Sequence, residues 1–570
     1  MGIPIDKDAA FDTESTGIEE TDVPFGFSWA DSKSQEFLDE RVVSNTWDIA
    51  SNLFADSSRI WYAQNAKFDK RMLEAKGIKI TGKIYDIAIA ARVLRNDYLG
   101  KAYSLEAQAK RHGMEKDKTV ELYIKDNGLI ETRRNYFGVE YEAPRYDRVP
   151  LDMMNKYAAH DARITKDLAT IYNSKADSDD RRIIEMECEL TDVCYNMERV
   201  GVKLSEEYTL KALYHERDKL TQLKEKFKDA TGKDFVNSAK SIEPLLGFSL
   251  PRTESGNPSL TDDVIDSLVH QGKGATIFPL VQDIRYYDKR ISTYYESYLN
   301  KMDRKGFIHP TMWQAGTRTG RFSYSDPNLQ NIPKEEDSID PYVVRGCFVP
   351  RSTDHVFLSF DYSQMEYRLM AAYANEAEII RQVMLGEDFH KVTANIFGVT
   401  RKQAKTLNFA ILYGAGKEKL AYMLGVPVEE AEGLRSRYFM AMPNVEQLVW
   451  RIKKIGKERG YVKNWLGRKL FADYQHTYAL PNHLIQGGGA DVVKKAMVEC
   501  SRAIDKDCLM VLQVHDQLVF DTPKELIKPT INIVKEIMEN TFPTKNGMKL
   551  TVDVSMSEVS FAERDMRKVV

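Results

Sequence analysis

Acidic side chains recur at three places in the first third of the chain, each within a pattern typical of regular structure. A short apolar run ends in Asp12 and Glu14, and because strand side chains alternate, both carboxylates point to the same side. Asp69 stands among apolar residues at helical spacing, and Tyr157 and Asp161 lie one helical turn apart. Like charges held close together are costly unless a cation lies between them, and two divalent cations about 3.5–4 Å apart can hydrolyse a phosphodiester. The pattern therefore predicts a two-metal site, although a chance Asp-x-Glu and a solvated helical turn are the ordinary alternatives for each motif.

A second group combines cations with aromatic rings in the segment RKQAKTLNFAILYGAG. Arg401, Lys405, Phe409 and Tyr413 are spaced by four residues, so on a helix they share one slowly winding face. Cations followed by flat rings suit a ligand with a charged tail and a flat head, such as a nucleoside triphosphate. An amphipathic helix with a solvated basic end and aromatic core residues stays open as the alternative from this segment alone.

Two further carboxylates stand at the ends of apolar strand patterns in the second half of the chain. Asp361 follows the apolar strand HVFLSF, a position that suits either a metal ligand or a helix N-cap. Asp516, preceded by His515, stands at the turn of the strand–turn–strand pattern CLMVLQVHDQLVFD. Taken alone, the second pattern is an ordinary hairpin with an aspartate turn, so metal binding there depends on the other motifs.

The order of the first three motifs, DxE, NxxxD and YxxxD, resembles the proofreading 3′–5′ exonucleases of the DEDD superfamily, tyrosine subtype. The resemblance implies that four carboxylates bind metal and that Tyr157 orients the attacking water. The implied ligands are Asp12, Glu14, Asp69 and Asp161. Since all four are present, we expect an active exonuclease, with no 5′-nuclease domain before it.

Longer strings in the second half resemble the DNA polymerases of family A. They are TGRFSYSDPNLQNIP, DYSQMEYRLMA, the RxxxKxxxFxxxYG segment and VHDQ, in the order of that family. The resemblance implies that Asp361 and Asp516 bind the catalytic magnesium ions, and that Glu366 lies where a ribose 2′-hydroxyl would have to fit. It also implies contacts to the incoming nucleotide by His390, Arg401, Lys405, Phe409 and Tyr413.

Polar side chains around these motifs suit minor-groove contacts to a duplex end, because amides and arginines can bond to base edges. The resemblance implies DNA contacts by Arg321, Asn328, Gln330, Asn482, Gln486 and His515. Three positions depart from the family's pattern, namely Tyr367, Ala410 and Gln517, which replace leucine, glycine and glutamate. We expect polymerase activity to survive the replacement of glutamate by Gln517, because Asp361 and Asp516 are retained.

Length and composition are those of a multidomain globular protein. At 570 residues, with 43% hydrophobic and 29% charged residues, the chain is too long for one core. No apolar run approaches the roughly 20 residues of a membrane span, and MGIPIDKDAAFD is not a signal peptide. Five cysteines without a CxxC pair favour a reduced, cytosolic setting without structural zinc. The net charge of −4 argues weakly against bulk coating of nucleic acid, but not against a groove lined by cations.

The fold class that we expect is α/β multidomain, with an RNase H-like exonuclease followed by a right-hand polymerase. The predicted divisions are exonuclease 1–175, thumb 176–300, palm 301–375, fingers 376–480, and palm with C-terminus 481–570. The predicted function is template-directed DNA synthesis with proofreading, using two Mg²⁺ ions in each site, for which Mn²⁺ could substitute. Primer–template DNA and dNTPs are the expected partners of a monomer in the host bacterial cytoplasm, and helicase or single-strand binding partners are left open.

Three other functions share part of this pattern. A single-subunit RNA polymerase shares the palm, but Glu366 and the exonuclease motifs argue against it. A nuclease with an inactive, DNA-holding polymerase half would have lost a palm carboxylate, and a non-catalytic DNA-binding protein would not keep both acid sets. The YGAGKEKLAYML segment is closer to short-tailed-phage polymerases than to bacterial DNA polymerase I, so we expect a bacteriophage replicative enzyme. Some phages with such compact polymerases replace adenine by 2-aminoadenine, so a preference for that base is a further hypothesis.

Overall fold

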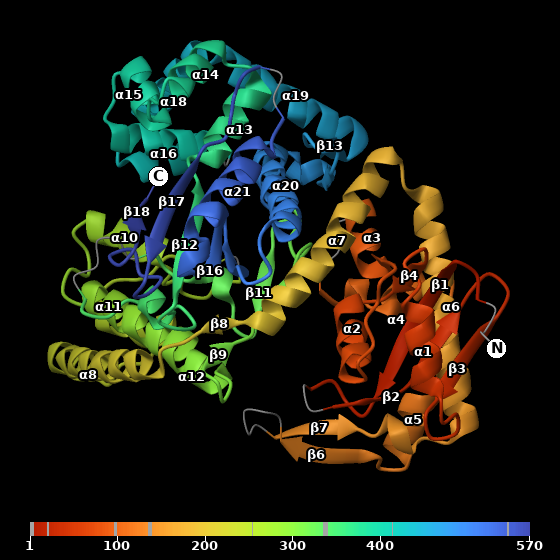
Figure 1. The fold of residues 1–570 in the computed structure, drawn as a ribbon. Helices are drawn as coiled ribbons and strands as arrows, with labels where there is room; N and C mark the ends of the chain where they lie inside the picture. Colours follow the sequence, from red (N-terminus) through yellow and green to blue (C-terminus); the bar gives the residue numbers. More distant parts are fainter. Residues whose placement is uncertain are drawn as a thin grey trace.

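The chain forms two lobes, and the helix α7 (Ser178–Val200) runs from one to the other (Figure 1). The computed structural model describes residues 5–19, 22–95, 100–134, 140–253, 255–334, 340–412, 414–543 and 546–569. Both lobes combine helices with a sheet, so the predicted α/β multidomain class is confirmed. The helix α7 ends at its C-cap Gly201, whose φ of 63° suits a glycine.

A five-stranded sheet forms the core of the N-terminal lobe, in the order β3 (Gln35–Asp39), β2 (Pro24–Ala30), β1 (Asp8–Ser15), β4 (Ile60–Ala63) and β5 (Lys83–Asp86). The strand β1 pairs antiparallel with β2 and parallel with β4. It is therefore the central strand, and six of its eight residues are buried.

Helices cover both faces of this sheet, and most of them come from the first 175 residues. They are α1 (Thr46–Phe54), α2 (Ala66–Ala75), α3 (Ile87–Leu94), α4 (Leu105–Arg111), α5 (Thr119–Asp126) and α6 (Leu151–Lys175). Ala9 and Phe11 pack in one cluster with α1 and α2, whereas Ala10 packs on the other side with α3 and α6. Because β1 is enclosed from both sides, a carboxylate at its end is held away from bulk water. A hairpin of β6 (Ile130–Arg134) and β7 (Glu140–Pro144) extends from this lobe (Figure 1).

An antiparallel sheet lies at the centre of the C-terminal lobe, in the order β15 (Leu509–Val514), β16 (Gln517–Pro523), β12 (His355–Tyr362), β17 (Val552–Ser557) and β18 (Arg567–Lys568). The predicted buried strand HVFLSF is the first part of β12, so this prediction is confirmed. The helix α21 (Ile527–Asn540) packs against the sheet, and α20 (Leu480–Ala503) packs in turn against α21 and α13 (Met365–Ala374). A single large apolar core continues from this sheet into the helices on either side.

Two helical parts flank the second sheet. The part that follows α7 contains α8 (Glu206–Thr231), α9 (Ala239–Ile242), α10 (Asp262–His270), α11 (Phe278–Lys289), a π-helical segment (Arg290–Glu296) and α12 (Ser297–Lys301). The upper part in Figure 1 contains α14 (Ala377–Met384), α15 (Phe389–Phe397), α16 (Arg401–Leu412), α17 (Lys417–Leu424), α18 (Val428–Ala441) and α19 (Pro443–Arg459). The two parts and the sheet between them enclose the region where the second set of motifs meets.

Short strands connect these parts. They are β8 (Val202–Lys203) with β9 (Phe307–Ile308), β10 (Thr311–Trp313) with β11 (Ser323–Ser325), and β13 (Tyr461–Lys463) with β14 (Lys469–Phe471). The β13–β14 hairpin reaches the start of α7, where Lys469 Nζ lies 2.6 Å from Asp180. This contact ties the upper helices to the junction between the lobes.

Buried charges also fix α7 against the C-terminal lobe. Arg468 donates from Nε to Asp491 of α20 (2.9 Å), and both Arg468 and Lys494 contact the Glu187 carboxylate of α7. All four side chains are at most 3% exposed. Buried charges are tolerated only when they are paired, so removing any one member would leave an uncompensated charge. The cluster therefore couples the two lobes through α7.

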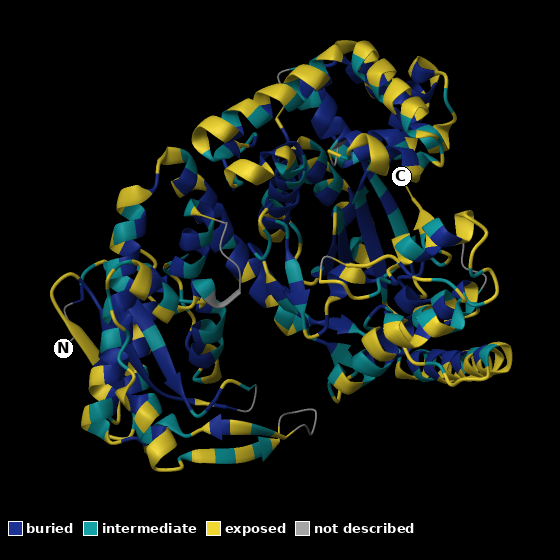
Figure 2. Cartoon of the chain, turned by 180° about the vertical axis from the view of Figure 1, so that it is seen from behind, coloured by how far each residue is buried: buried dark blue, intermediate teal, exposed yellow. Residues whose placement is uncertain are grey.

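Exposed residues lie mainly on the outward sides of the helices, while the central strands β1 and β12 of the two sheets are largely buried (Figure 2). In the described ranges, no helix combines the length and the apolar character needed to cross a membrane. The helix α6 ends at Lys175 and α12 at Lys301, close to two of the predicted domain divisions. The divisions themselves stay predictions.

Candidate active sites

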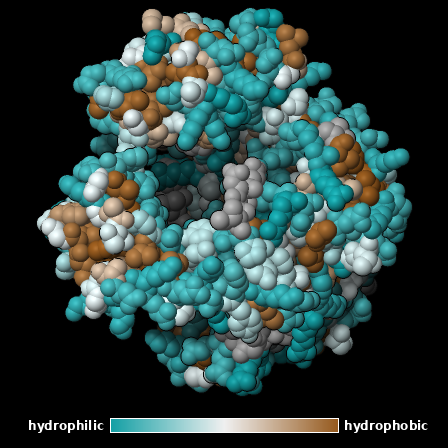
Figure 3. Space-filling model, turned by 90° about the vertical axis from the view of Figure 1, so that its left-hand side faces the viewer, coloured by the Kyte–Doolittle hydropathy of each residue, from teal (hydrophilic) through white to brown (hydrophobic). Residues whose placement is uncertain are grey.

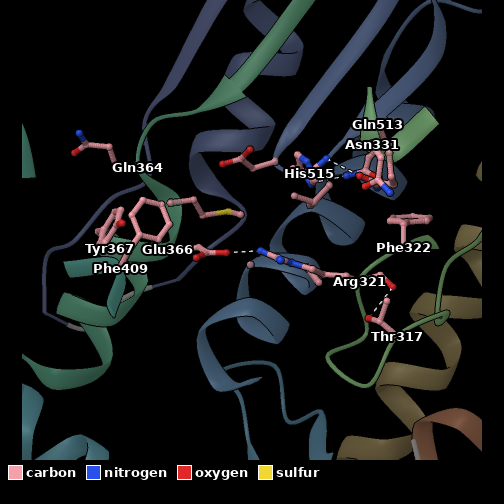
Figure 4. A pocket seen from close by; sticks show the side chains of 16 residues that line it. Thr317, Arg321, Phe322, Asn331, Gln364, Glu366, Tyr367, Phe409, Gln513 and His515 are labelled. Atoms are coloured by element: carbon pink, nitrogen blue, oxygen red, sulfur yellow. Dashed lines mark hydrogen bonds and ion pairs between the residues drawn. The ribbon is translucent and has the colours of Figure 1, made fainter. Parts of the chain in front are cut away.

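A cavity of about 580 Å³ opens beside the turn between β15 and β16. Side chains from the turn-rich segment before β12, from α13, α16 and α20, and from the β15–β16 turn line it (Figure 4). Among the predicted site residues, the structure brings together in this lining Arg321, Gln330, Glu366, Phe409, His515 and Asp516. In the space-filling view the molecule is hollowed beneath the upper helices (Figure 3).

Of the two predicted palm carboxylates, Asp361 lies near the end of β12, and Asp516 lies in the turn between β15 and β16. Asp361 is the seventh residue of β12 and pairs with Gln517 of β16, and the Tyr362 amide donates to the Asp516 carbonyl oxygen (3.3 Å). Burial, and then the nearby charge of Asp361, raise the pKa of Asp516 to about 7. The two carboxylates repel each other when both are ionised, and a divalent cation between them would stabilise that doubly charged form.

A strained turn presents Asp516, because the preceding His515 has a φ of 56°, in the left-handed region. The His515 amide donates to Oε1 of Gln330 (2.9 Å), and Nε2 of Gln330 donates to Oε1 of Gln513 (2.6 Å). Gln330 thus holds the turn in place from a segment far away in sequence. Its predicted DNA contact stays a prediction, beside this positioning role.

Glu366, the predicted sugar-sensing residue, forms an ion pair with Arg321 across the cavity (Figure 4). Next to it, the Tyr367 ring meets the Phe409 ring edge to face, with centroids 5.4 Å apart. Tyr367 also stacks on Phe389, at 5.2 Å. The tyrosine that replaces the family's leucine therefore supports the Phe409 ring, which is predicted to contact the incoming nucleotide.

The predicted phosphate-binding end of α16 is held by an acid from the preceding helix. Asp388 accepts from Arg401 through Nε (3.1 Å) and Nη2 (2.9 Å). Asp388 also accepts from Gln364 Nε2 (2.6 Å), which ties the upper helices to the turn after β12. Lys405 is exposed one helical turn after Arg401. A triphosphate that binds Arg401 would therefore have to compete with Asp388.

His390 and Tyr413 are the other two residues of this part for which the sequence predicts contact with the nucleotide. His390 is 3% exposed, lies outside the cavity lining, and has Nδ1 3.1 Å from Nδ2 of Asn408. Burial lowers the pKa of His390 to about 4, so its imidazole is neutral at pH 7. Tyr413 lies outside the described residues. Contacts of both side chains with a nucleotide stay predictions.

Three predicted DNA contacts surround the cavity without lining it. Asn328 accepts the Gln330 amide through Oδ1 (3.1 Å) and so begins the short helical turn that carries Gln330. Asn482 and Gln486 lie one turn apart on α20, both half-buried, in the turns that precede cavity-lining Gly489. The helix α20 could therefore present both amides to a duplex that enters the cavity.

The four carboxylates predicted for the N-terminal site converge from β1, α2 and α6. Oδ1 of Asp69 accepts from the amide (2.9 Å) and hydroxyl (2.7 Å) of Thr13, which lies between the two acids of β1. Burial, and then the charges of Asp69 and Asp161, raise the pKa of Asp12. Burial, and then Asp12 and Asp161, raise the pKa of Glu14. These pKa shifts agree with the prediction from the sequence that the four acids lie close together.

Lys116, which the sequence patterns do not single out, reaches into this cluster. Its Nζ lies 3.0 Å from Oδ2 of Asp161 and donates to the Tyr157 hydroxyl oxygen at 3.0 Å. The Tyr157 hydroxyl in turn donates to Glu121 (3.2 Å). Burial would lower the pKa of Lys116, but Asp161, Glu121 and Asp12 together outweigh it and raise the pKa, so the side chain is an ammonium ion. One fixed cation therefore partly compensates the carboxylates.

Metal binding would require these side chains to rearrange. Among the described residues, no group of three or more His, Cys, Asp or Glu side chains is arranged so that it could hold a metal ion as it stands. Oδ1 of Asp161 is nevertheless buried and has no hydrogen-bond partner in the described part of the chain. Carboxylate oxygens are the ligands that Mg²⁺ and Mn²⁺ prefer, so the donor set fits a hard divalent cation.

Lys116, Asp388 and Gln513 are the site residues that the sequence patterns missed. Lys116 stands in the charged segment MEKDKTVELY, where nothing distinguishes it from other surface lysines. Asp388 is the N-cap of α15, and an aspartate before a helical pattern indicates a cap rather than a partner for Arg401. Gln513 lies within a strand pattern three residues before Asp516, and only its position next to the predicted turn could have marked it.

Comparison with known families identifies the class of protein that this fold and these sites define. The family model described as DNA polymerase family A matches residues 207–562, and that described as 3′-5′ exonuclease matches residues 5–176. The first match covers more than half of the chain, so the chain belongs to DNA polymerase family A. Both resemblances seen in the sequence are thereby confirmed, as is the order of exonuclease and polymerase parts.

Several bacterial enzymes are similar to this chain. DNA polymerase I of Chloroflexus aurantiacus is 28% identical over 527 residues, covering 86% of this chain and 53% of that protein. DNA polymerase I of Geobacillus stearothermophilus is 30% identical over 512 residues, covering 84% of this chain and 55% of that protein. The chain thus spans about half the length of the curated relatives it matches.

The fold also resembles a solved structure, the POL domain of Pol1 from M. smegmatis in complex with DNA primer-template and dNTP. That likeness has a TM-score of 0.83 at 21% identity and covers 97% of this chain and 95% of the other. At this identity the likeness shows that the two chains share a fold across both lobes. The similar proteins named here are bacterial, and the expected phage origin stays a prediction.

Proposed function

We propose that the chain is a DNA-dependent DNA polymerase with its own 3′–5′ exonuclease. The observation that carries the polymerase proposal is the placement of Asp361 on β12 next to the β15–β16 turn that presents Asp516, which lines a cavity together with Phe409 of α16. Family membership and the similar DNA polymerase I enzymes support the same activity. An inactive, merely DNA-holding polymerase half would not need both carboxylates at this edge of the sheet.

The proposed reaction is in-line attack of a primer 3′-hydroxyl on the α-phosphate of a dNTP, with pyrophosphate leaving. Asp361 and Asp516 would hold Mg²⁺, which when bound would activate the attacking hydroxyl and stabilise the leaving oxygen. Arg401 and Lys405 would neutralise the phosphates as charge develops on pyrophosphate. Because Asp388 already holds Arg401, nucleotide binding would exchange one anionic partner for another.

Selection of deoxyribose is assigned to Glu366. Arg321 holds the Glu366 carboxylate on the cavity wall, and the Tyr367 and Phe409 rings pack beside it. A carboxylate fixed in this way leaves little room for a 2′-hydroxyl and would disfavour ribonucleotides. This feature favours DNA synthesis over the RNA polymerase alternative.

In the N-terminal lobe, the proposed reaction is attack of water on the last phosphodiester of the primer, which releases a nucleotide 5′-monophosphate. Asp12, Glu14, Asp69 and Asp161 would hold the metal ions, and Tyr157 would orient the water. The match of residues 5–176 to the 3′-5′ exonuclease family supports this role. Two carboxylate clusters in two lobes would thus provide two opposed activities in one chain.

A primer-extension assay with a matched primer tests the proposed function. Extension is expected with dNTPs and Mg²⁺, with little incorporation of rNTPs and none after chelation of the metal. Equal use of rNTPs would overturn the role of Glu366, and extension after chelation would overturn the metal role of Asp361 and Asp516. Competition between dATP and its 2-amino analogue opposite template T tests the hypothesis of a modified-base preference.

Primer–template DNA and dNTPs are the proposed partners, and the bound ligands named for the M. smegmatis Pol1 structure support this choice. A monomeric state, a cytoplasmic location and a bacteriophage source are parts of the same proposal that depend on the sequence resemblance. Sedimentation of the purified chain with and without primer–template DNA tests the first of these.

A further inference from the structure

His390 of α15 and Asn408 of α16 meet where these two helices pack against each other. His390 is 3% exposed, and Asn408 is fully buried. Nδ2 of Asn408 lies 3.1 Å from Nδ1 of His390 and 2.9 Å from Oγ1 of Thr393. An imidazole nitrogen can donate or accept, so the contact with His390 alone does not show which ring nitrogen carries the proton. The second contact of Asn408 decides it.

Thr393 fixes the orientation of the Asn408 amide. The Thr393 hydroxyl oxygen lies 3.0 Å from the carbonyl oxygen of Phe389 and 3.2 Å from that of His390. Both carbonyl oxygens can only accept, so the single hydroxyl hydrogen is donated to them, and Oγ1 is left to accept from Asn408. One N–H bond of Asn408 therefore points at Thr393, and the other points at His390.

The opposite orientation of this amide would cost more. It would set the Asn408 carbonyl oxygen against Thr393 and move both N–H bonds to the place that Oδ1 occupies. As placed, Oδ1 is buried and has no hydrogen-bond partner in the described part of the chain. A buried carbonyl oxygen without a partner is less costly than buried N–H bonds without acceptors. A leucine would avoid even this cost, so the N–H bonds of Asn408 are the feature that calls for a role.

The Asn408 N–H bond that points at Nδ1 of His390 makes this nitrogen an acceptor. The ring is neutral at pH 7, because burial lowers the pKa of His390 to about 4. Among nearby charges, that of Asp388 raises this pKa, and those of Arg401 and Lys405 lower it. The Tyr367 ring of α13 packs edge to face against the imidazole, with centroids 4.6 Å apart. The single ring proton of His390 is therefore on Nε2.

This Nε2–H bond is a donor in search of an acceptor. In the described ranges, Nε2 of His390 forms no hydrogen bond with the protein. His390, Arg401 and Lys405 all lie outside the lining of the 580 Å³ cavity, and the two cations are near enough to act on the imidazole through their charge. An anionic oxygen held by these cations would supply the acceptor that Nε2–H lacks.

We infer that Asn408 is a positioning residue of the nucleotide site, which holds His390 in the neutral form protonated at Nε2. In this form the imidazole can only donate toward a phosphate oxygen. That the acceptor belongs to a nucleotide rests on the proposed polymerase function, whereas the position of the proton does not. A carboxylate in place of Asn408 would have the opposite effect, because it holds the proton on the nitrogen that faces it. Nε2 would then be an acceptor and would repel a phosphate oxygen.

Long-range ¹H–¹⁵N correlation spectra of the full chain, labelled at histidine, show which ring nitrogen is protonated. His390→Gln identifies the signals of His390. At about pH 9, where an imidazole is neutral, we expect a protonated Nε2 and an unprotonated Nδ1. Asn408→Asp should place a proton on Nδ1. A protonated Nδ1 in the unmodified chain, or an unprotonated Nδ1 in Asn408→Asp, would overturn the inference.

Asn408→Leu is the second variant, in case a buried aspartate prevents folding. It adds no charge and removes the N–H bond that faces His390. An imidazole without a donor at Nδ1 exchanges its proton between both nitrogens, so the Nδ1 signal should move toward that of a protonated nitrogen. An Nδ1 signal identical to that of the unmodified chain would mean that another group fixes the proton, and it would contradict the role of Asn408.

Steady-state primer extension distinguishes positioning from a purely structural role. Asn408→Asp should raise KM for the dNTP about tenfold and change kcat less than about twofold, because the lost bond is one to the bound nucleotide. In a His390→Gln background, where no imidazole proton remains to be placed, the same change should raise KM less than about twofold. An equal rise in both backgrounds would show that Asn408 acts only through the packing of α16.

Gln403→Glu is the matched control, since it makes the same amide-to-acid change on α16. The Gln403 side chain bonds to Thr400 and not to His390, so the signals of His390 should be unchanged and KM should change less than about twofold. The spectra are recorded without nucleotide, so they test the position of the proton even if primer extension fails. In that case the role of Asn408 in fixing the proton stands, and only its use in nucleotide binding falls with the proposed polymerase function.

Discussion

The two carboxylate clusters differ in how their charge is compensated within the chain. In the N-terminal lobe, Lys116 places an ammonium group against Asp161 and Tyr157, inside a cluster whose acids are largely buried. In the C-terminal lobe, Arg321 acts on Asp516 through its charge but forms its ion pair with Glu366, beside a cavity of about 580 Å³. The first cluster is closed around an internal cation, whereas the second opens to a space that could admit a large substrate.

This difference matches the size of what each site would have to accept. An exonuclease needs room for the end of one strand, and a polymerase must admit a duplex end together with a nucleotide. In a closed site, an internal cation can reduce the repulsion between the carboxylates until metal ions displace it. In an open site, the incoming metal ions can compensate the charge of the carboxylates when they arrive with the substrate.

The largest expected effect is the loss of synthesis when Asp516 is changed to alanine. Loss of one metal ligand should cost about 4 kcal/mol of transition-state stabilisation, or about a thousandfold in the rate of primer extension. Excision of a mismatched primer end should remain near the wild-type rate, because the N-terminal cluster is untouched. Glu558→Ala, an exposed acid paired with Lys524 next to the same sheet, is the control and should extend primers normally. Full extension by Asp516→Ala would show that DNA synthesis does not depend on the carboxylates of the C-terminal lobe.

The converse change, Asp12→Ala/Glu14→Ala, should remove excision while extension of a matched primer continues. The expected loss is again about a thousandfold, measured as release of mononucleotides from a mismatched primer end. Asp48→Ala, which removes an exposed acid of α1, provides the control in the same lobe. If excision persisted in the double variant, the acids of β1 would not be the metal ligands.

A smaller effect should follow from removing the internal cation by Lys116→Met. The cluster would become more negative by one charge, so its affinity for Mn²⁺ should rise about tenfold, which corresponds to about 1.4 kcal/mol. Free Mn²⁺ measured by electron paramagnetic resonance, in an Asp361→Ala/Asp516→Ala background, would report the N-terminal site alone. Lys116→Arg keeps the charge and should bind Mn²⁺ like the parent. Unchanged or weaker binding in Lys116→Met would mean that the ammonium does not compete with the metal.

The smallest effect is expected at Gln517, where the family usually has glutamate. Gln517 pairs with Asp361 across the strands, and its Nε2 donates to the Ser359 hydroxyl at 2.5 Å. Gln517→Glu adds a carboxylate near the metal ligands, so half-maximal extension should need about two- to threefold less Mg²⁺. Titration of Mg²⁺ in steady-state extension measures this. A requirement for more Mg²⁺ would show that the amide is the better neighbour in this chain.

Local patterns were sufficient to predict the elements that carry the acids. Asp361 follows a continuous apolar run, and such a run can only be a buried strand or helix segment, so its end was a recognisable site. The spacing of Arg401, Lys405 and Phe409 likewise follows from the period of the helix α16. In each case the chemistry and the element are encoded within a dozen neighbouring residues.

Contacts between distant segments could not be predicted in this way. Lys116 reaches Asp161 only because the segment before α5 packs against α6, and Asp388 meets Arg401 only because α15 and α16 lie side by side. The burial of His390 depends on Asn408 and Tyr367 from two other helices. These placements result from packing, and nothing in the local sequence distinguishes them from solvated alternatives.

The central claim is that each lobe has its own metal-binding carboxylate cluster, one open and one closed around Lys116. Crystals of the chain with primer–template DNA and Mn²⁺, examined by anomalous scattering, test it directly. We predict Mn²⁺ peaks beside Asp361 and Asp516, and beside Asp12, Glu14, Asp69 and Asp161, with the Lys116 ammonium moved away from Asp161. Strong Mn²⁺ peaks elsewhere with none at one of these clusters would contradict the account.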